Sequence, residues 1–113
     1  LDGKLDGVSI RVPTPNVSCV DLTFHAARAT TEAEINAAIA EAAGSGPLQG
    51  VLGYTEDKLV SMDLNHDPRS SIFAAEQTKV LGGPLVRILS WYDNEWGFSN
   101  RMNDIAVEIA KRI

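Results

Sequence analysis

Two polar side chains of this sequence are candidates for binding a ligand. Arg11 lies among the alternating aliphatic residues Val8, Ile10 and Val12, and its guanidinium offers the fixed donors that bind a phosphate or a carboxylate. Asn94 lies between an apolar run and a helical pattern, and its amide carries both a donor and an acceptor, as a primary amide on a ligand does. Simpler interpretations stay open, namely an exposed or ion-paired arginine and a helix N-cap at Asn94.

The stretch from residue 90 to residue 101 surrounds Asn94 with polar and aromatic side chains. It contains both tryptophans of the chain, together with Phe98. Large rings mixed with amides and carboxylates at the end of an element are typical of a recognition site. Asp93 suits the N-cap of the following helix as well as Asn94 does.

The remaining reactive side chains are weaker candidates. Cys19 lies within an apolar run with no histidine close in sequence, which favours a small buried hydrophobe over a nucleophile. His25 and His66 lack the spacing of metal-ligand motifs, and His66 falls in a turn-like sequence. We therefore interpret both as ordinary surface histidines and predict no metal site.

The apolar pattern predicts an α+β fold, with helices on one face of a mixed or antiparallel sheet. Thr31 and Glu34 have the spacing of a capping box, which begins a helix that ends at Gly44. A second helix is expected to follow the junction, with Phe98, Met102, Ile105 and Ile109 on one face. Strands are expected at residues 8–12, 17–24, 50–54, 59–62, 72–75, 78–81 and 85–89.

The run from residue 17 to residue 24 differs from a simple half-buried strand. Its apolar residues cannot all face one way, so the sequence predicts either a central strand buried on both faces or a bulge.

Charge and composition exclude several classes of protein. The 113 residues carry 10 basic and 15 acidic side chains, a net charge of −5, and show no basic cluster for nucleic acid. No apolar run approaches the roughly 20 residues that span a membrane. The single cysteine excludes an internal disulfide framework. Because the sequence begins with Leu1 and opens like a loop, we expect a segment of a longer, soluble protein from a reducing compartment.

Four segments closely resemble phosphorylating glyceraldehyde-3-phosphate dehydrogenase. They are LDGVSIRVPTPNVS at 5–18, VDLT at 20–23, GPLQGVLGYTE at 46–56 and SWYDNEWGFSNR at 90–101. The resemblance runs in order over essentially the whole chain and corresponds to about the C-terminal third of that enzyme.

The resemblance implies roles for three residues. It implies that Arg11 helps bind the C3 phosphate of the substrate, and that Asn94 bonds to the carboxamide of the nicotinamide ring. Phe98 stands where the family usually has tyrosine, so it would pack near the cofactor without a hydroxyl contact. The family's catalytic cysteine, in a Ser-Cys-Thr-Thr-Asn motif, and its histidine base are not in this sequence and are expected upstream. We therefore expect no catalytic residue here and no activity from this segment alone.

The resemblance also implies how the chain is organised and what it works with. Residues 1–92 would form the second half of the catalytic domain, and residues 93–113 a C-terminal helix that packs on the protein's own N-terminal NAD-binding domain. The full-length protein would be a cytoplasmic, glycolytic homotetramer that uses NAD or NADP. It would convert glyceraldehyde 3-phosphate and inorganic phosphate to 1,3-bisphosphoglycerate through a cysteine thioester, whereas the segment alone would not bind the cofactor. Alternatives are a segment of erythrose-4-phosphate dehydrogenase and a non-catalytic binding or structural fragment.

Overall fold

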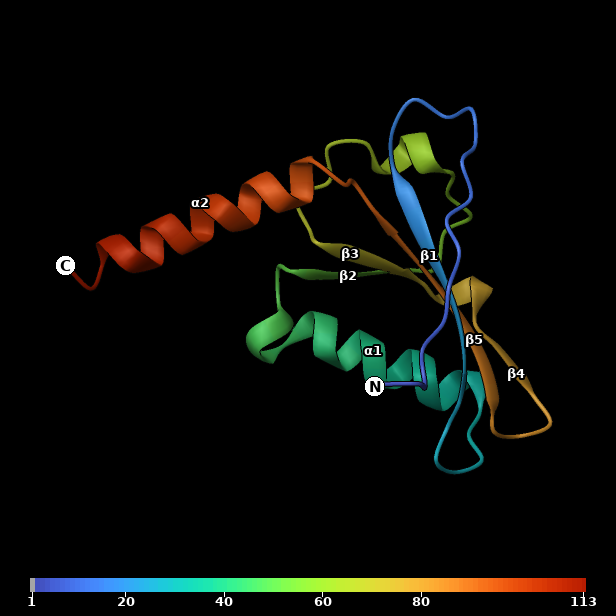
Figure 1. Cartoon of the computed structure of the whole chain (residues 1–113). Helices are drawn as coiled ribbons and strands as arrows, with labels where there is room; N and C mark the ends of the chain where they lie inside the picture. The colour runs from blue at the N-terminus through green and yellow to red at the C-terminus, as the bar shows by residue number, and fades with distance from the viewer. Residues whose placement is uncertain (1) are drawn as a thin grey trace.

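Strand β5, Leu85–Tyr92, is the central strand of a mixed sheet of five strands (Figure 1). In this computed structural model, which describes residues 2–113, β1 (Ser18–His25) pairs antiparallel with β5 over its whole length. Strands β3 (Ser71–Ala74) and β4 (Lys79–Leu81) pair antiparallel with β5 one after the other. Strand β2 (Leu52–Thr55) completes the sheet, parallel to β3. Leu1, the first residue of the predicted opening loop, lies outside the described residues.

The core lies where β3 and β5 meet. Ile72 and Val86 are fully buried, and Phe73 is 2% exposed. Val17, Leu64 and Ile72 form a cluster against which Trp91 and Leu59 pack. The apolar residues of the two strands thus bury one part of the sheet, as β-branched and aromatic side chains do on a pleated surface. The predicted strands at 50–54, 72–75, 78–81 and 85–89 are confirmed, with shifts of one to three residues at their ends.

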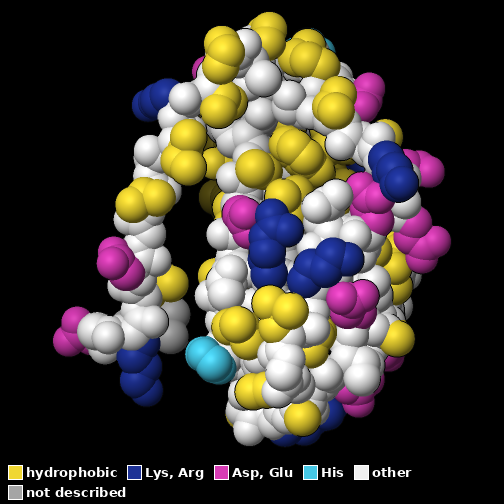
Figure 2. Space-filling model, turned by 90° about the vertical axis from the view of Figure 1, so that its right-hand side faces the viewer, with side chains coloured by type: hydrophobic (Ala, Val, Ile, Leu, Met, Phe, Trp, Pro, Cys, Tyr) yellow, Lys and Arg dark blue, Asp and Glu magenta, His cyan; other side chains and the backbone are white. Residues whose placement is uncertain are grey.

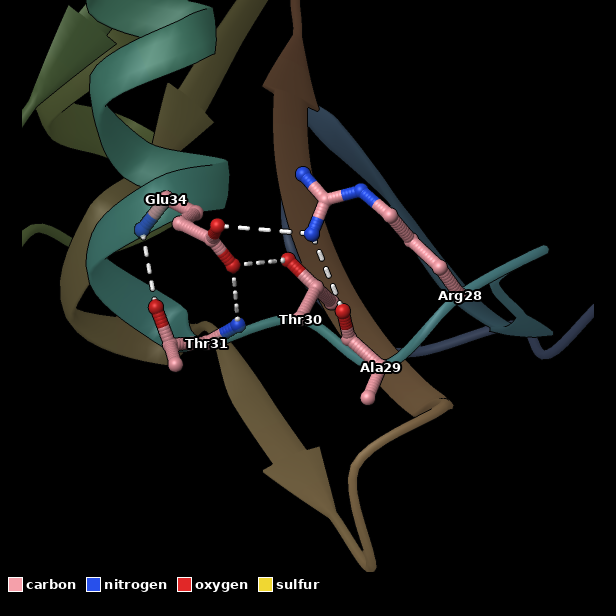
Figure 3. A network of polar contacts seen from close by, with 5 residues as sticks. All are labelled: Arg28, Ala29, Thr30, Thr31 and Glu34. Carbon is pink, nitrogen blue, oxygen red and sulfur yellow. Dashed lines mark hydrogen bonds and ion pairs between the residues drawn. The ribbon is translucent and has the colours of Figure 1, made fainter.

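Helix α1, Glu32–Gly44, begins with the predicted capping box. The Thr31 hydroxyl accepts from the Glu34 N–H at 3.2 Å, and the Glu34 carboxylate accepts from the Thr31 N–H at 3.0 Å. The same carboxylate accepts from the Thr30 hydroxyl and pairs with Arg28 (Figure 3). Orphan donors at the helix start are therefore satisfied from both directions.

Helix α1 is joined to the sheet by its own polar side chain. The Asn36 amide donates to the Ala75 carbonyl at 3.1 Å and accepts from the buried Thr78 hydroxyl at 2.7 Å. Both partners lie at η3, Ala75–Gln77, or directly after it. Because these groups are buried or half-buried, their mutual hydrogen bonds fix the helix against the β3–β4 connection.

Helix α2, Trp96–Ala110, follows β5 and projects away from the sheet (Figure 1). Its first turn packs against the loop before β3, where Gly97 is buried against the backbone of Arg69. The predicted apolar stripe is exposed: Phe98, Met102, Ile105 and Ile109 are 54–66% accessible. None of the helices described is long and apolar enough to cross a membrane.

Two predicted strands are wrong. Residues 8–12 run without regular structure, and Val8 is 90% exposed, because no strand of the described residues pairs with them. Around residues 59–62 the chain turns into η2, Ser61–Leu64. There the Asp63 carboxylate accepts from the Val60 N–H at 2.8 Å, a local bond that competes with a strand ladder.

The burial predicted for residues 17–24 is also wrong. Strand β1 lies at the edge of the described sheet and pairs with β5 alone. Seven of its eight residues are exposed and one is half-buried. Its apolar residues therefore mark a strand whose faces are open in this chain, without a bulge in its register with β5.

Candidate functional site

The carboxylate of Asp93 is the centre of a buried hydrogen-bond network between β5 and α2. Asp93 is 2% exposed. Its Oδ1 accepts from the backbone N–H groups of Glu95 at 3.1 Å and Trp96 at 2.9 Å. Its Oδ2 accepts from the Asn16 amide at 2.9 Å and from the His66 N–H at 3.0 Å. Four donors thus surround one buried carboxylate, which satisfies it without a cation.

These donors keep Asp93 charged. Burial by itself raises the pKa of Asp93, but the N–H groups of Trp96, His66 and Glu95 and the Asn16 amide together hold the pKa below its ordinary value. Each of these bonds favours the ionised form because an ionised carboxylate accepts at both oxygens. The network is therefore complete at neutral pH.

Asp93 fixes the turn that carries Asn94. The Asp93 carbonyl accepts from the Gly97 N–H at 3.3 Å, while its side chain accepts from Glu95 and Trp96. These bonds resemble those of a helix N-cap: Asp93 holds the turn that leads into α2, although the helix itself begins at Trp96, directly after Glu95. Asn94 lies exposed in the turn that Asp93 closes. The bonds to the N–H groups of this turn come from Asp93, so they give the Asn94 amide no capping role.

The second oxygen of Asp93 fixes the segment that carries Arg11. Asn16 donates from the same Nδ2 to Asp93 and to the Asn65 side chain at 2.7 Å. The next residue, Val17, has φ +68° and is 5% exposed. A β-branched residue rarely adopts this left-handed backbone, so the buried Val17 and the bonds of Asn16 hold the corner at which the N-terminal segment turns into β1.

Arg11 and Asn94 line the same open hollow. It lies between the N-terminal segment and the sheet, and its wall includes Cys19, Trp91 and Tyr92. In Figure 2 the N-terminal segment forms the column at the left, and a gap separates it from the body of the molecule. None of the ion pairs within residues 2–113 involves Arg11, which is exposed. The structure therefore brings the two predicted ligand-binding side chains to one hollow.

Phe98 lies apart from these two residues. It belongs to the exposed stripe of α2, with its side chain 66% accessible, and it does not line the hollow formed by the described residues. Its predicted packing beside a cofactor stays a prediction.

Cys19 and the histidines have surroundings of their own. Cys19 is exposed, so the prediction that it is a small buried hydrophobe is wrong, because β1 is an edge strand. His25 and His66 are both exposed, as predicted. The ring of His66 lies 4.6 Å from the ring of Trp96, and its backbone is left-handed at φ +63°. In the described part of the chain, no three His, Cys, Asp or Glu side chains are grouped to hold a metal ion.

Sequence reasoning missed Asn16 and Asn65 and gave Asp93 only a capping role. Asn16 and Asp93 are 77 positions apart, so no local spacing connects them. One signal was available: Asn16 follows the Pro13-Thr14-Pro15 segment, and an amide directly after such a rigid segment is well placed to fix a turn.

Comparison with known proteins identifies sequence relatives of this chain. The family described as glyceraldehyde 3-phosphate dehydrogenase, C-terminal domain, matches residues 1–94. Glyceraldehyde-3-phosphate dehydrogenase of Cereibacter sphaeroides is 68% identical over 98% of this chain, and that of Xanthobacter flavus is 64% identical over 98%. The Zymomonas mobilis protein of the same name is 57% identical over the whole chain.

The chain covers 33%, 33% and 34% of these three relatives, so it spans about a third of their length. The high identity over this third, together with the family match over most of the chain, identifies the family. The chain belongs to the glyceraldehyde 3-phosphate dehydrogenase family and corresponds to the C-terminal domain of its members.

Proposed function

We propose that the full-length protein is a cytoplasmic NAD-dependent dehydrogenase that oxidises and phosphorylates glyceraldehyde 3-phosphate in glycolysis. In this proposal the present chain contributes Arg11 to the substrate phosphate site and Asn94 to the nicotinamide site. The observation that carries the proposal is that both side chains line one hollow, in a chain that is 57–68% identical to proteins named glyceraldehyde-3-phosphate dehydrogenase.

Arg11 suits a phosphate because its charge forms no ion pair among the described residues. Its side chain is exposed at the hollow, and none of the ion pairs in residues 2–113 includes it. A phosphate that binds there forms charge-assisted hydrogen bonds without first breaking an ion pair. A planar guanidinium also fixes the direction of the phosphate, which orients the rest of the substrate.

Asn94 suits the carboxamide of a nicotinamide because a primary amide donates and accepts one hydrogen bond with another amide. The turn that carries Asn94 is held by the Asp93 carboxylate through Glu95 and Trp96. Among the side chains that line the hollow, the Arg11 guanidinium therefore suits a phosphate and the Asn94 amide suits a carboxamide. Bound NAD supplies the hydride acceptor, and the task of Asn94 is to orient its ring. Because the turn is already ordered, orienting the ring does not require ordering the backbone at the same time.

The nucleophile and the base are assigned to the remainder of the protein. Cys19 is exposed on an edge strand. We therefore expect the segment alone to be inactive and to bind NAD or NADP too weakly for catalysis.

Two surfaces support the proposed partners. The exposed stripe of α2 suits packing on an N-terminal nucleotide-binding domain, because a helix buries such a stripe in its stable state. Apolar residues of β1, among them Val20 and Phe24, are also exposed and suit a homotetramer interface.

Steady-state kinetics of the full-length protein test the proposal. We expect Arg11→Ala to raise KM for glyceraldehyde 3-phosphate by at least about tenfold, the usual loss for a hydrogen bond to a charged group. The KM for unphosphorylated glyceraldehyde should stay unchanged. Equal effects on both aldehydes would remove Arg11 from the phosphate site. If the protein turns over erythrose 4-phosphate in preference to glyceraldehyde 3-phosphate, the proposed substrate is wrong, while the proposed role of Arg11 in binding a phosphate stays.

A further inference from the structure

The two candidate binding residues are connected through a single carboxylate. Oδ1 of Asp93 accepts from the backbone on the Asn94 side, from Glu95 at 3.1 Å and Trp96 at 2.9 Å. Oδ2 accepts from the Asn16 amide at 2.9 Å. The two oxygens of one group are rigidly joined, so a shift of the carboxylate on one side moves the acceptor on the other.

Asn16 connects the N-terminal segment to this carboxylate by a hydrogen bond. It lies five positions after Arg11, beyond two prolines that restrict the backbone on either side of Thr14. The segment from Leu5 to Val12 is exposed along its whole length. Its position over the hollow therefore depends on the corner at Asn16 and Val17, at which the Val17 side chain is buried.

The corner at Val17 needs these bonds. A valine at φ +68° is a strained backbone, which persists only where its surroundings over-determine it. Burial of Val17 against Leu64 and Ile72 and the two bonds from Asn16 provide those constraints. Removing the Asn16 amide leaves the strained corner with packing alone.

We infer that Asp93 and Asn16 form a positioning pair that couples the phosphate-binding segment to the nicotinamide-binding turn. The inference rests on the proposed function, since it concerns how Arg11 and Asn94 are held relative to each other. Asp93 is buried. Asn16 also lines the hollow, but its amide already donates to Asp93 and Asn65, so its proposed role is that of a positioning residue. The pair sets a distance across the hollow, and a bound substrate and cofactor must both match that distance.

Asn16→Ala in the full-length protein tests the inference. This variant leaves three of the four donors to Asp93 in place, so the junction is expected to fold. We expect the preference for glyceraldehyde 3-phosphate over unphosphorylated glyceraldehyde, in kcat/KM, to fall about three- to tenfold, the range that the loss of one hydrogen bond spans. We also expect the Kd for NAD, measured by calorimetry, to rise about two- to fivefold for the same reason.

Asn36→Ala is the matched control. Asn36 also makes two structural hydrogen bonds, to Ala75 and Thr78, but it lies on α1 and does not line the hollow of the described residues. It should lower the melting temperature while leaving both the substrate preference and the Kd for NAD unchanged. A loss of preference in Asn36→Ala equal to that in Asn16→Ala would show a general effect of stability and overturn the inference.

A second variant, Asp93→Asn, keeps the shape of the side chain but turns an acceptor into a donor that faces the Asn16 amide. Like Asn16→Ala, it should lower the preference for the phosphorylated aldehyde and raise the Kd for NAD. If Asp93→Asn does not fold, Asn16→Ala still decides the matter. An unchanged Kd for NAD in Asn16→Ala would overturn the coupling, because the amide would then act on the N-terminal segment alone.

Arg11→Ala separates this inference from the proposed function. If Arg11→Ala leaves the preference for the phosphorylated aldehyde intact, the proposed function fails and the inference fails with it. If Arg11→Ala lowers the preference but Asn16→Ala leaves it intact, the inference alone is wrong.

Discussion

Gly97 lies so close to the carbonyl oxygen of Arg69 that a Cβ at this position would be 2.8 Å from it. Gly97 is buried in the first turn of α2, and Arg69 belongs to the loop that leads into β3. The close approach fixes the start of α2 to the sheet, directly beside the Asp93 network. The contact is between backbone atoms, so no side-chain rotation can relieve it.

Gly97→Ala should therefore destabilise the chain. The added methyl group must push the helix away from residues 69 and 70, and overpacking of this kind costs about 1–3 kcal/mol. Urea unfolding followed by circular dichroism measures the loss. Gly44→Ala is the control, since a Cβ there meets no atom of the described residues within 4 Å; it should be neutral or stabilise by up to about 1 kcal/mol. Equal stabilities of the two variants would contradict the close contact.

The low pKa of Asp93 predicts a contribution to stability that depends on pH. Because the folded-state pKa lies below that of the unfolded chain, this contribution is present above about pH 4, the unfolded value for an aspartate, and is lost as the pH falls through the folded value. Asp93→Asn should cost about 1–3 kcal/mol at pH 7, as an unsatisfied buried group does. The difference in the free energy of unfolding between wild type and Asp93→Asn, measured by urea unfolding, should narrow below about pH 4.

Comparing wild type with Asp93→Asn controls for the other carboxylates whose pKa is lowered. Asp21 and Asp67 also have lowered pKa values, caused first by hydrogen bonds from Arg87 and Arg69, but both remain in the variant and their effects cancel in the difference. A difference between wild type and Asp93→Asn that stays constant from pH 7 to pH 3 would show that the carboxylate charge is not what the network stabilises.

Thr31→Ala should weaken α1 at its beginning. The variant removes the hydroxyl that accepts from the Glu34 N–H, and loss of an N-cap costs about 0.5–2 kcal/mol. Thr31→Ser keeps the acceptor and should retain most of the stability. Thermal unfolding of the two variants decides between a capping role and a role of the Thr31 methyl group, which would be lost equally in both.

The cross-strand pair of Asp21 and Arg87 should contribute little. Its two hydrogen bonds are both 2.8 Å long, but the side chains are 50% and 37% exposed. A double-mutant cycle with Asp21→Asn and Arg87→Gln should give only a small coupling energy at low salt, and a smaller one in 1 M sodium chloride, where screening is stronger. A larger coupling that resists salt would indicate that the pair is buried in the protein as assembled.

Asn94→Ala should affect ligand binding without affecting folding. Its side chain is exposed, so the melting temperature of the chain should stay the same. In the full-length protein the Kd for NAD should rise about fivefold, equivalent to one hydrogen bond of about 1 kcal/mol. An unchanged Kd together with an unchanged rate of hydride transfer would remove Asn94 from the nicotinamide site.

Local signals predicted the elements that local bonds determine. The capping box at Thr31 and Glu34 predicted the beginning of α1. The gap between the expected strands at 78–81 and 85–89 correctly separated β4 from β5, where Gly82 and Gly83 have φ +61° and +91°. Where burial depends on a partner, the same patterns failed. Residues 8–12 alternate like a strand but have no partner strand among the described residues, and β1 has the apolar content of a core strand but lies at an edge.

The roles of Arg11 and Asn94 stay predictions, and the choice of site residues from the sequence has the same limit. Arg11 and Asn94 could be chosen by their side-chain chemistry and by the family resemblance, and the structure brings both to one hollow. The residue pair that holds them could not be found, because a hydrogen bond between positions 77 apart leaves no periodic signal. The left-handed backbone at Val17 was equally hidden, since valine is the last residue type that φ preferences would place there.

Helix α2 is attached at one end, beside the candidate site, and projects from the sheet at the other (Figure 1). A helix of 15 residues is about 22 Å long, so a tilt of about 5° at its fixed end moves the free end by about 2 Å. The fixed end is the turn that Asp93 closes around Asn94. A surface that packs on the outer turns of α2 would restrict such tilts, although its contacts would lie up to about 22 Å from the turn that carries Asn94.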